Sequence, residues 1–230
     1  MGEVTFRSDM TVNLIEAMAS DEAVVRAARV SSGSRGSLEA DKGLINYLMR
    51  DRHGSPFEHN AFTFYIEAPI FVFREFQRHR IASYNEESAR YKELEPVFYI
   101  PNGDRKLIQR GKPGAYKFGE GTEEQVFLTK TELETHSSEA YLSYKYLLDE
   151  GIAREVARMC LPVNIYSSMY VTINARSLMN FLSLRSLEQG KFPSFPQAEI
   201  AMVADEMENY FSNRMPETYE AFIKNGRVAP

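Results

Sequence analysis

Apolar and polar residues recur with two different periods along the chain, and these periods predict its elements. The run NAFTFYIEAP at 60–69 places large apolar residues at every second position, which is typical of a half-buried strand. Helical spacing instead runs through 21–30 and 38–51, and Ser20 is a suitable N-cap for the first of these helices. The sequence HGSP at 53–56 then predicts a turn.

The rest of the chain continues this mixture of helices and short strands. Further helices are expected at 70–78, 124–150, 152–160, 175–187, 197–214 and near 217–225, and further strands at 95–101 and 164–173. Residues 102–123 carry five of the thirteen glycines and little periodicity, so we expect a mobile surface insertion there. With 230 residues, the chain suits a single domain over 1–230, of the α+β class.

Composition and charge narrow the class of protein. The net charge of −5 disfavours a nucleic-acid binder, and no apolar run approaches the roughly 18 to 20 residues of a membrane span. The N-terminal residues lack the order of a signal peptide, and a single cysteine suits a reducing cytoplasm. That cysteine, Cys160, stands among apolar neighbours, which predicts buried packing. We expect no metal site, because the histidines and the cysteine show no tight spacing.

Candidate chemistry concentrates in residues 78–91, RHRIASYNEESARY. Between positions 74 and 92, five lysines and arginines stand against three glutamates, and the planar guanidinium fork suits phosphate or carboxylate oxygens. The pattern alone fits a solvated polar loop equally well. In that alternative Ser83 and Glu86 form a capping box, and a capped helix start is itself an anion site.

Two further segments carry arginines at helical spacing. Arg154 and Arg158 are an i,i+4 pair, for which an exposed and ion-paired helix face is the ordinary explanation. Arg176 and Asn180 share one face of the 175–187 helix, whereas Arg185 points about half a turn away. These three side chains therefore cannot all reach one ligand atom from a single helix. No P-loop, GxSxG or GxGxxG pattern is present.

The polar constellation resembles that of the flavin-dependent thymidylate synthases. Their signature RHRxxSxxxxSxRY is matched at every fixed position by Arg78, His79, Arg80, Ser83, Ser88, Arg90 and Tyr91. Further similar segments follow in the family's order: DEAVVRAARVS, HGSPFEH, REVARMCLP and NARSLMNFLSLR. The resemblance covers most of the chain apart from 102–123 and the C-terminal helices.

The resemblance implies an enzyme, a methyltransferase that converts dUMP to dTMP. NADPH would reduce a bound FAD, methylenetetrahydrofolate would supply the one-carbon unit, and the reduced flavin would supply the hydride. The implied fold is α+β, with mixed helices and a small, mostly antiparallel sheet. The implied assembly is a cytoplasmic homotetramer with active sites at subunit interfaces, and without nucleic-acid or membrane partners.

The family's motifs also imply residue roles. Arg185 is the expected catalytic residue, because a fixed positive charge beside N3 favours the ionised uracil ring. No cysteine nucleophile is expected, since Cys160 is badly placed. The residues expected to bind dUMP are Glu75, Gln77, Arg78, Glu86, Glu87, Ser88, Ala89, Arg90, Arg158 and Arg185. Those expected to bind FAD are His53, Ser55, Arg78, His79, Arg80, Asn174, Ala175, Arg176 and Asn180. In the family pattern, the 86–90 loop comes from a different subunit than the segment at 75–78.

The chain departs from the family pattern at Glu75, where many members carry glutamine. A carboxylate cannot donate N–H bonds to a phosphate, and Gln77 offers an amide two positions later. Ser55 keeps the hydroxyl of the usual threonine. Two other functions stay open from the residues: a flavoprotein oxidoreductase that has lost nucleotide methylation, and a nucleic-acid-binding protein that uses the RHR loop on phosphates.

Overall fold

The computed structural model describes residues 3–31, 33, 37–112 and 116–230. The strands are β1 (Thr5–Arg7), β2 (Thr11–Met18), β3 (Ala61–Pro69), β4 (Ala82–Glu86), β5 (Val97–Tyr99), β6 (Ile108–Arg110), β7 (Lys117–Gly119) and β8 (Tyr166–Asn174). The helices are α1 (Asp21–Arg29), α2 (Leu38–Arg50), α3 (Ser55–Glu58), α4 (Ile70–Phe76), α5 (Glu123–Asp149), α6 (Arg154–Ala157), the 3-10 turn η1 (Arg158–Cys160), α7 (Ala175–Arg185), α8 (Ala198–Arg214) and α9 (Pro216–Lys224).

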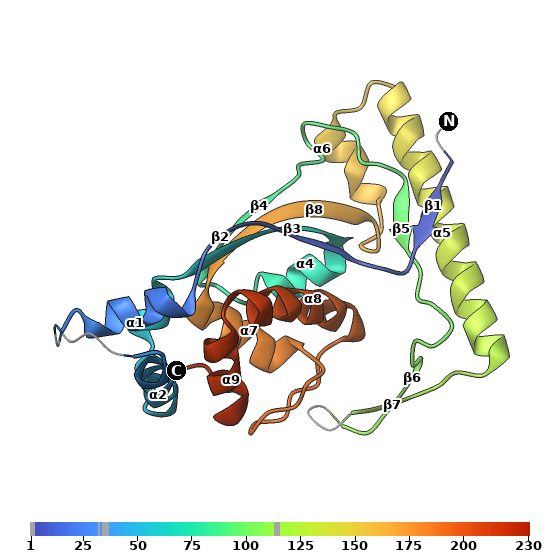
Figure 1. The fold of residues 1–230 in the computed structure, drawn as a ribbon. Coiled ribbons are helices and arrows are strands. Elements are labelled where there is room, and N and C mark those ends of the chain that lie inside the picture. Colours follow the sequence, from blue (N-terminus) through green and yellow to red (C-terminus); the bar gives the residue numbers. More distant parts are fainter. Residues whose placement is uncertain (1–2, 32, 34–36, 113–115) are drawn as a thin grey trace. The chain divides into compact units, whose positions relative to one another are not determined.

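Helices and strands are mixed along the chain, as the α+β class requires (Figure 1). The largest sheet has four strands in the order β2-β3-β8-β4. Two smaller sheets have two strands each: β1 pairs with β5 in parallel, and β6 pairs with β7 in antiparallel register.

The chain forms two compact units, each assembled from separate segments. The first unit comprises Glu67–Glu75, Glu86–Ser168 and the N-terminal residues to Met10, as far as they are described. The second unit comprises the described residues of Thr11–Ile66, together with Phe76–Asn85 and Met169–Pro230.

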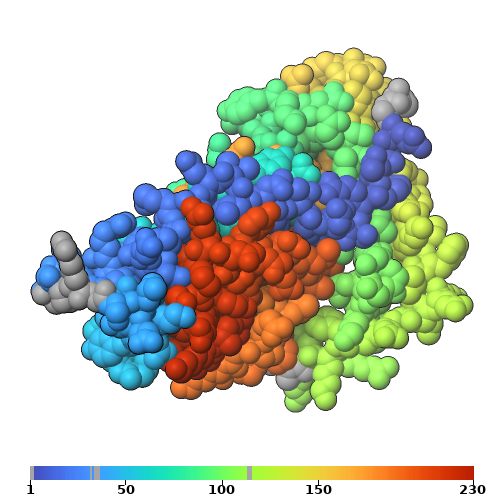
Figure 2. All heavy atoms as spheres, in the orientation of Figure 1, coloured from blue at the N-terminus to red at the C-terminus, as the bar shows by residue number. Residues whose placement is uncertain are grey.

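The core of the second unit lies between the sheet and the helices α7 and α8, which cover one of its faces (Figure 1). Phe62, Phe64 and Ile66 of β3 are fully buried, as their alternation with polar residues predicts. Phe62 meets Phe211 of α8 edge to face, with the ring centroids 6.1 Å apart. Helix α9 packs against α2 and α1, and on the face drawn in Figure 2 these elements lie directly together.

The core of the first unit is built where α5 meets the segment around β5. Tyr144 is fully buried, and its hydroxyl accepts from the N–H of Leu94 at 3.4 Å. Tyr141 donates its own hydroxyl to the Leu94 carbonyl at 3.0 Å and stands edge-on to Phe98. The two phenol groups therefore satisfy the backbone of Leu94, which would otherwise be buried without partners.

Capping residues mark several helix boundaries, and the N-cap predicted at Ser20 is confirmed. The Ser20 side chain accepts from Ala23 N at the start of α1, and Asn174 accepts from Ser177 N at the start of α7. Gly151, just beyond α5, has a φ of +78°, a conformation that glycine adopts without steric cost.

Several local predictions are wrong. The HGSP segment begins the short helix α3, with Pro56 in its first turn, rather than forming a simple turn. Residues 82–86 form the strand β4, so Ser83 and Glu86 make no capping box and no helix starts there. Strands β1 and β2 were not predicted. Within 102–123, β6 and β7 form a hairpin-like pair, and residues 113–115 of that insertion lie outside the described residues.

Removal of the Phe211 ring tests the core of the second unit. We expect Phe211→Ala to lower the free energy of unfolding by about 3 to 5 kcal/mol, because the ring is fully buried against Phe62 and Tyr219. Denaturant unfolding followed by circular dichroism measures this. The control is Phe192→Ala, which removes a ring that is 63% exposed and should change the value by less than about 0.5 kcal/mol.

Candidate active site

A large cavity in the second unit, called here the arginine cavity, has a volume of about 610 Å³. It is lined by Arg78, His79, Arg80, Ile81, Arg176, Ser177, Asn180, Leu184, Arg185, Ala229 and Pro230. Four guanidinium groups face it, and no carboxylate side chain is among these lining residues in the described part of the chain. The donor set and the volume suit a large anionic ligand such as a dinucleotide with its diphosphate.

The turn after α4 holds the RHR motif against the first residues of β4. Tyr84 of β4 donates its hydroxyl to the carbonyl of His79 at 2.6 Å and lies 3.1 Å from that of Phe76. The Phe76 ring stacks on Phe181 of α7 at a centroid distance of 4.5 Å. Apolar packing and one phenol therefore fix a backbone segment whose arginine side chains remain exposed.

His79 and Arg185 form the best-defined polar contact of the cavity. Arg185 Nε donates to His79 Nε2 at 3.1 Å, and the imidazole stands edge-on to Phe181 at 4.9 Å. Burial, together with the nearby Arg185 charge, lowers the pKa of His79 to about 4. The imidazole is therefore neutral at pH 7. It accepts a hydrogen bond and adds no further positive charge to the cavity.

Arg176 is held from two sides within the second unit. It donates through Nη1 to Glu58 Oε1 and through Nε to the Pro230 carbonyl, both at 2.6 Å. The backbone at Gly54 approaches it so closely that a Cβ there would lie 2.8 Å from Arg176 Cδ. The HGSP segment, with the expected flavin residues His53 and Ser55, therefore lies beside the arginine cavity without lining it.

The polar side chains of α7 lie closer together than their helical spacing predicts. Arg176, Asn180 and Arg185 all line the arginine cavity, although Arg185 starts half a turn away. Arg185 is the last residue of α7, and its long side chain reaches the cavity, where its Nε donates to His79 Nε2. Asn174 uses its side chain as the helix cap, and Ala175 is fully buried and donates its N–H to Asn60 O.

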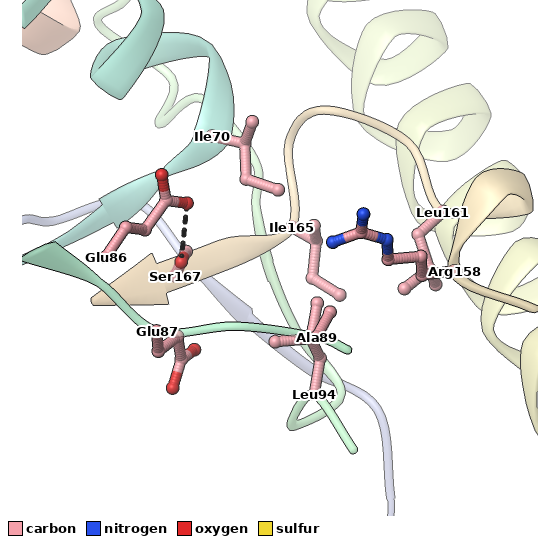
Figure 3. Close-up of a pocket in the computed structure, with 9 residues that line it drawn as sticks. All are labelled: Ile70, Glu86, Glu87, Ala89, Leu94, Arg158, Leu161, Ile165 and Ser167. Atoms are coloured by element: carbon pink, nitrogen blue, oxygen red, sulfur yellow. Dashed lines mark hydrogen bonds between the residues drawn. The ribbon is translucent and has the colours of Figure 1, made fainter. Parts of the chain in front are cut away.

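A smaller cavity of about 110 Å³, called here the Glu86 cavity, lies in the first unit (Figure 3). It is lined by Ile70, Glu86, Glu87, Ala89, Leu94, Arg158, Leu161, Ile165 and Ser167. Four of the residues expected to bind dUMP therefore come together here: Glu86, Glu87, Ala89 and Arg158. The Arg158 guanidinium approaches from η1, whereas Glu86 approaches from the end of β4 (Figure 3).

Burial raises the pKa of Glu86, and its neighbour Glu87 acts in the same direction. The hydroxyl of Ser167 opposes this by donating to Glu86 Oε1 at 2.9 Å. Glu87 forms an ion pair with Lys92 at 2.8 Å. The cavity thus offers one cation, the carboxylate of Glu86 hydrogen-bonded to Ser167, the carboxylate of Glu87 paired with Lys92, and a mainly apolar lining.

Ser88 and Arg90 lie in the turn beyond β4 and do not line either cavity as described. The Ser88 hydroxyl accepts from Arg90 N at 3.3 Å, while Arg90 Nε contacts Glu155 Oε2 at 3.0 Å. Both partners of that ion pair are about half exposed, so it contributes little to stability.

Glu75 and Gln77 do not share a helix face, since α4 ends between them at Phe76. Glu75 is half-buried in α4 and Gln77 is exposed, and neither is among the described residues that line the two cavities.

The expected burial of Cys160 is wrong, because the residue is exposed. Its thiol donates to the Ala157 carbonyl at 3.1 Å, at the end of η1. No group of three or more histidine, cysteine or acidic side chains suited to a metal ion occurs among the described residues.

Sequence reasoning missed ten of the residues that line these cavities, among them Ser167, Ala229 and Pro230. Ser167 is an ordinary strand position in the sequence, and only the pairing of β8 with β4 brings it to Glu86. Ala229 and Pro230 carry no chemical signature, and their place follows from the packing around Arg176.

A family model described as "Thymidylate synthase complementing protein" matches residues 13–217. The chain belongs to this family. It is 59% identical to the flavin-dependent thymidylate synthase of Streptomyces avermitilis over 235 residues, which cover 98% of this chain and 96% of the relative. It is 61% identical to that of Tropheryma whipplei over 234 residues, with coverage of 98% and 97%.

Solved structures agree with the family assignment. A UMP/dUMP methylase, PolB from Streptomyces cacaoi bound with 5-Br UMP, is 50% identical and superposes with a TM-score of 0.94. The match covers 99% of this chain and all of the other. The resemblance drawn from the RHR motif is thereby confirmed, as are the α+β class and the assignment to an enzyme family of methyltransferases. No described helix is both long and apolar enough to span a membrane.

The neutral state of His79 can be measured directly. We expect an NMR titration of the imidazole to give a pKa near 4. Arg185→Gln should raise it toward the ordinary value of about 6.5, because a neighbouring cation then no longer opposes protonation. Arg185→Lys keeps a positive charge nearby and should leave the pKa low. An unchanged pKa in Arg185→Gln would show that burial alone sets it.

The same shift links His79 to stability. The unfolded chain binds a proton at His79 below about pH 6.5, whereas the folded chain does so only below about pH 4. This contribution to stability is therefore present above pH 6.5 and is lost as the pH falls from 6.5 to 4.

Proposed function

We propose that this protein is a flavin-dependent thymidylate synthase that methylates dUMP to dTMP. In this proposal NADPH is the reductant, methylenetetrahydrofolate supplies the carbon, and FAD is the bound cofactor. The whole chain acts as one functional domain in a homotetramer. The observation that carries the proposal is the arginine cavity, in which all three RHR residues meet Arg176, Asn180 and Arg185 of α7.

The arginine cavity is the proposed FAD site. Arg78, Arg80 and Arg176 are suited to the diphosphate oxygens, and Asn180 can donate and accept hydrogen bonds to the uncharged parts of the ligand. Ser55 and His53 flank this site through the close approach of Gly54 to Arg176. When bound, FAD supplies the hydride that the methylation requires.

Arg185 is the proposed catalytic residue. Its Nε is fixed by His79, which orients the guanidinium plane without adding a second charge. Such a preorganised cation stabilises negative charge at N3 and the adjacent carbonyl oxygen of uracil, and this makes C5 more nucleophilic. We propose no cysteine nucleophile. Cys160 bonds to a backbone carbonyl in η1 and lines neither described cavity, which supports this route.

The Glu86 cavity is the proposed dUMP contact surface. Arg158 offers a cation for the phosphate, and Glu86 offers a carboxylate for hydroxyl or N–H donors of the nucleotide. Its volume of about 110 Å³ is smaller than the roughly 300 Å³ at which ligand pockets begin. A nucleotide therefore fits only in part, which supports a site completed by another subunit. Ser88, Arg90, Gln77 and Glu75 are proposed to join that complete site.

Tritium release from C5-labelled dUMP tests the reaction. We expect release only when FAD, NADPH and methylenetetrahydrofolate are all present, and the omission of each in turn identifies the required components. Reduction of a bound flavin by NADPH without tritium release would instead establish a flavoprotein oxidoreductase that has lost nucleotide methylation.

Substitution of Arg185 tests the proposed mechanism. We expect Arg185→Ala to lower kcat by about 10² to 10³, because a preorganised charge stabiliser is removed, while the flavin stays bound through the other arginines. Flavin content is read from the absorption spectrum. Arg110→Ala, on the exposed strand β6, is the matched control and should leave kcat unchanged. A wild-type kcat in Arg185→Ala would contradict the assigned role.

A further inference from the structure

Ser167 is a buried polar residue whose partner faces a cavity. It lies near the start of β8 and is 4% exposed, and its Oγ donates to Glu86 Oε1 at 2.9 Å (Figure 3). One backbone hydrogen bond joins the two segments next to this contact, since Glu87 N donates to Ser168 O at 2.9 Å. The Ser167 hydroxyl therefore bonds to the Glu86 side chain, whereas the backbone bond between the two segments is made by Glu87 and Ser168.

The charged groups around Glu86 are few and come from two sides. Glu87 is the next residue in the chain, and its carboxylate forms an ion pair with Lys92, with Nζ and Oε2 2.8 Å apart. Arg158 approaches the cavity from η1. The other lining side chains are apolar: Ile70, Ala89, Leu94, Leu161 and Ile165. In such surroundings a carboxylate ionises less readily, and a donated hydrogen bond favours the ionised form.

A carboxylate in this position can take several rotamers, and only some of them aim its second oxygen at the cavity. A charge-assisted hydrogen bond to one oxygen restricts this choice. Figure 3 shows the Glu86 carboxylate turned to Ser167, whereas the Glu87 carboxylate points to the other side of the backbone. Ser167 thus separates the two neighbouring acids by giving only one of them a buried donor.

We propose that Ser167 is a positioning residue, whose hydroxyl holds the Glu86 carboxylate as an ionised, oriented acceptor for an uncharged hydroxyl or N–H donor of the nucleotide. The inference rests on the proposed function, because it takes the Glu86 cavity as a nucleoside monophosphate site. Ser167 itself acts through Glu86 and need not touch the ligand.

The experiment compares Ser167→Ala with Ser167→Thr in the complete enzyme, by calorimetric titration with dUMP and by tritium release from pH 5 to 9. We expect Ser167→Ala to weaken dUMP binding and raise its KM about tenfold, as loss of a hydrogen bond to a charged group does, with a smaller effect on kcat. The acid limb of the binding profile should move to higher pH, because Glu86 then accepts a proton more readily. Ser167→Thr keeps the hydroxyl and should restore much of the affinity.

Ser168→Ala is the matched control, since Ser168 is the next residue of β8 and its side chain points to the opposite face of the strand. It should leave binding and the pH profile unchanged. In a double-mutant cycle, Ser167→Ala should add little to Glu86→Gln, because the amide has no ionisation for the hydroxyl to support. If Ser167→Ala also lowers the thermal stability, the cycle still isolates the interaction between Ser167 and Glu86, because a general loss of stability would affect both backgrounds.

The outcomes separate this inference from the proposed function. Absence of dUMP binding to the wild-type protein would overturn the proposed function. Wild-type binding together with an unchanged KM and acid limb in Ser167→Ala would overturn only the role of Ser167. A loss of affinity that is equal in Ser167→Ala and Ser168→Ala, or that persists fully in the Glu86→Gln background, would also overturn it.

Discussion

The change from strand β8 to helix α7 at one residue, Asn174, is the constraint on which the arginine cavity depends. The Asn174 side chain accepts from Ser177 N at 2.8 Å, and Ala175 N donates to Asn60 O at 2.9 Å. Asn60 is itself fully buried, so the first turn of α7 has little freedom to rotate. Because helical side chains repeat every 3.6 residues, this fixed phase decides which side of α7 faces solvent and which faces the core. Arg176 and Asn180 then face the cavity, while Leu178 is packed inside.

The two cavities differ in how they manage charge. Around the arginine cavity, guanidinium groups gather, and the one titratable ring among them is kept neutral by burial. This limits mutual repulsion, and among the described residues no carboxylate side chain lines the cavity and competes with an anionic ligand. The Glu86 cavity combines one cation, Arg158, and two carboxylates, Glu86 and Glu87, with a mainly apolar lining. Such a mixed arrangement selects ligands by hydrogen-bond geometry as well as by charge. The different charge patterns match the different chemical parts of the ligands proposed for them.

Local sequence signals predicted the elements that are fixed by local chemistry. The alternation in β3 and the cap at Ser20 are both confirmed, since each depends on a few neighbouring residues. Strand β4 was missed because its polar sequence has no apolar alternation, and only its pairing with β8 makes it a strand. The same long-range pairing explains why Ser167 carried no signal. The three residues of the RHR motif lie together in the arginine cavity, but the spacing of Arg185 on α7 could not reveal that its long side chain reaches His79.

The interleaving of the two units has a consequence for how the chain folds as it leaves the ribosome. Residues of β1 pair in parallel with β5, more than 85 positions later, and the first unit is complete only when Ser168 has emerged. The second unit needs both the early segment before Ile66 and everything after Met169. The second unit therefore stays unfinished until the residues up to Pro230 have emerged, although its first segment is made before most of the first unit, whereas consecutive domains are completed one after the other during synthesis. Such non-local pairing raises the contact order and slows folding, so nascent chains expose unfinished strand edges for longer and should depend on chaperones more than a sequentially built protein of this size.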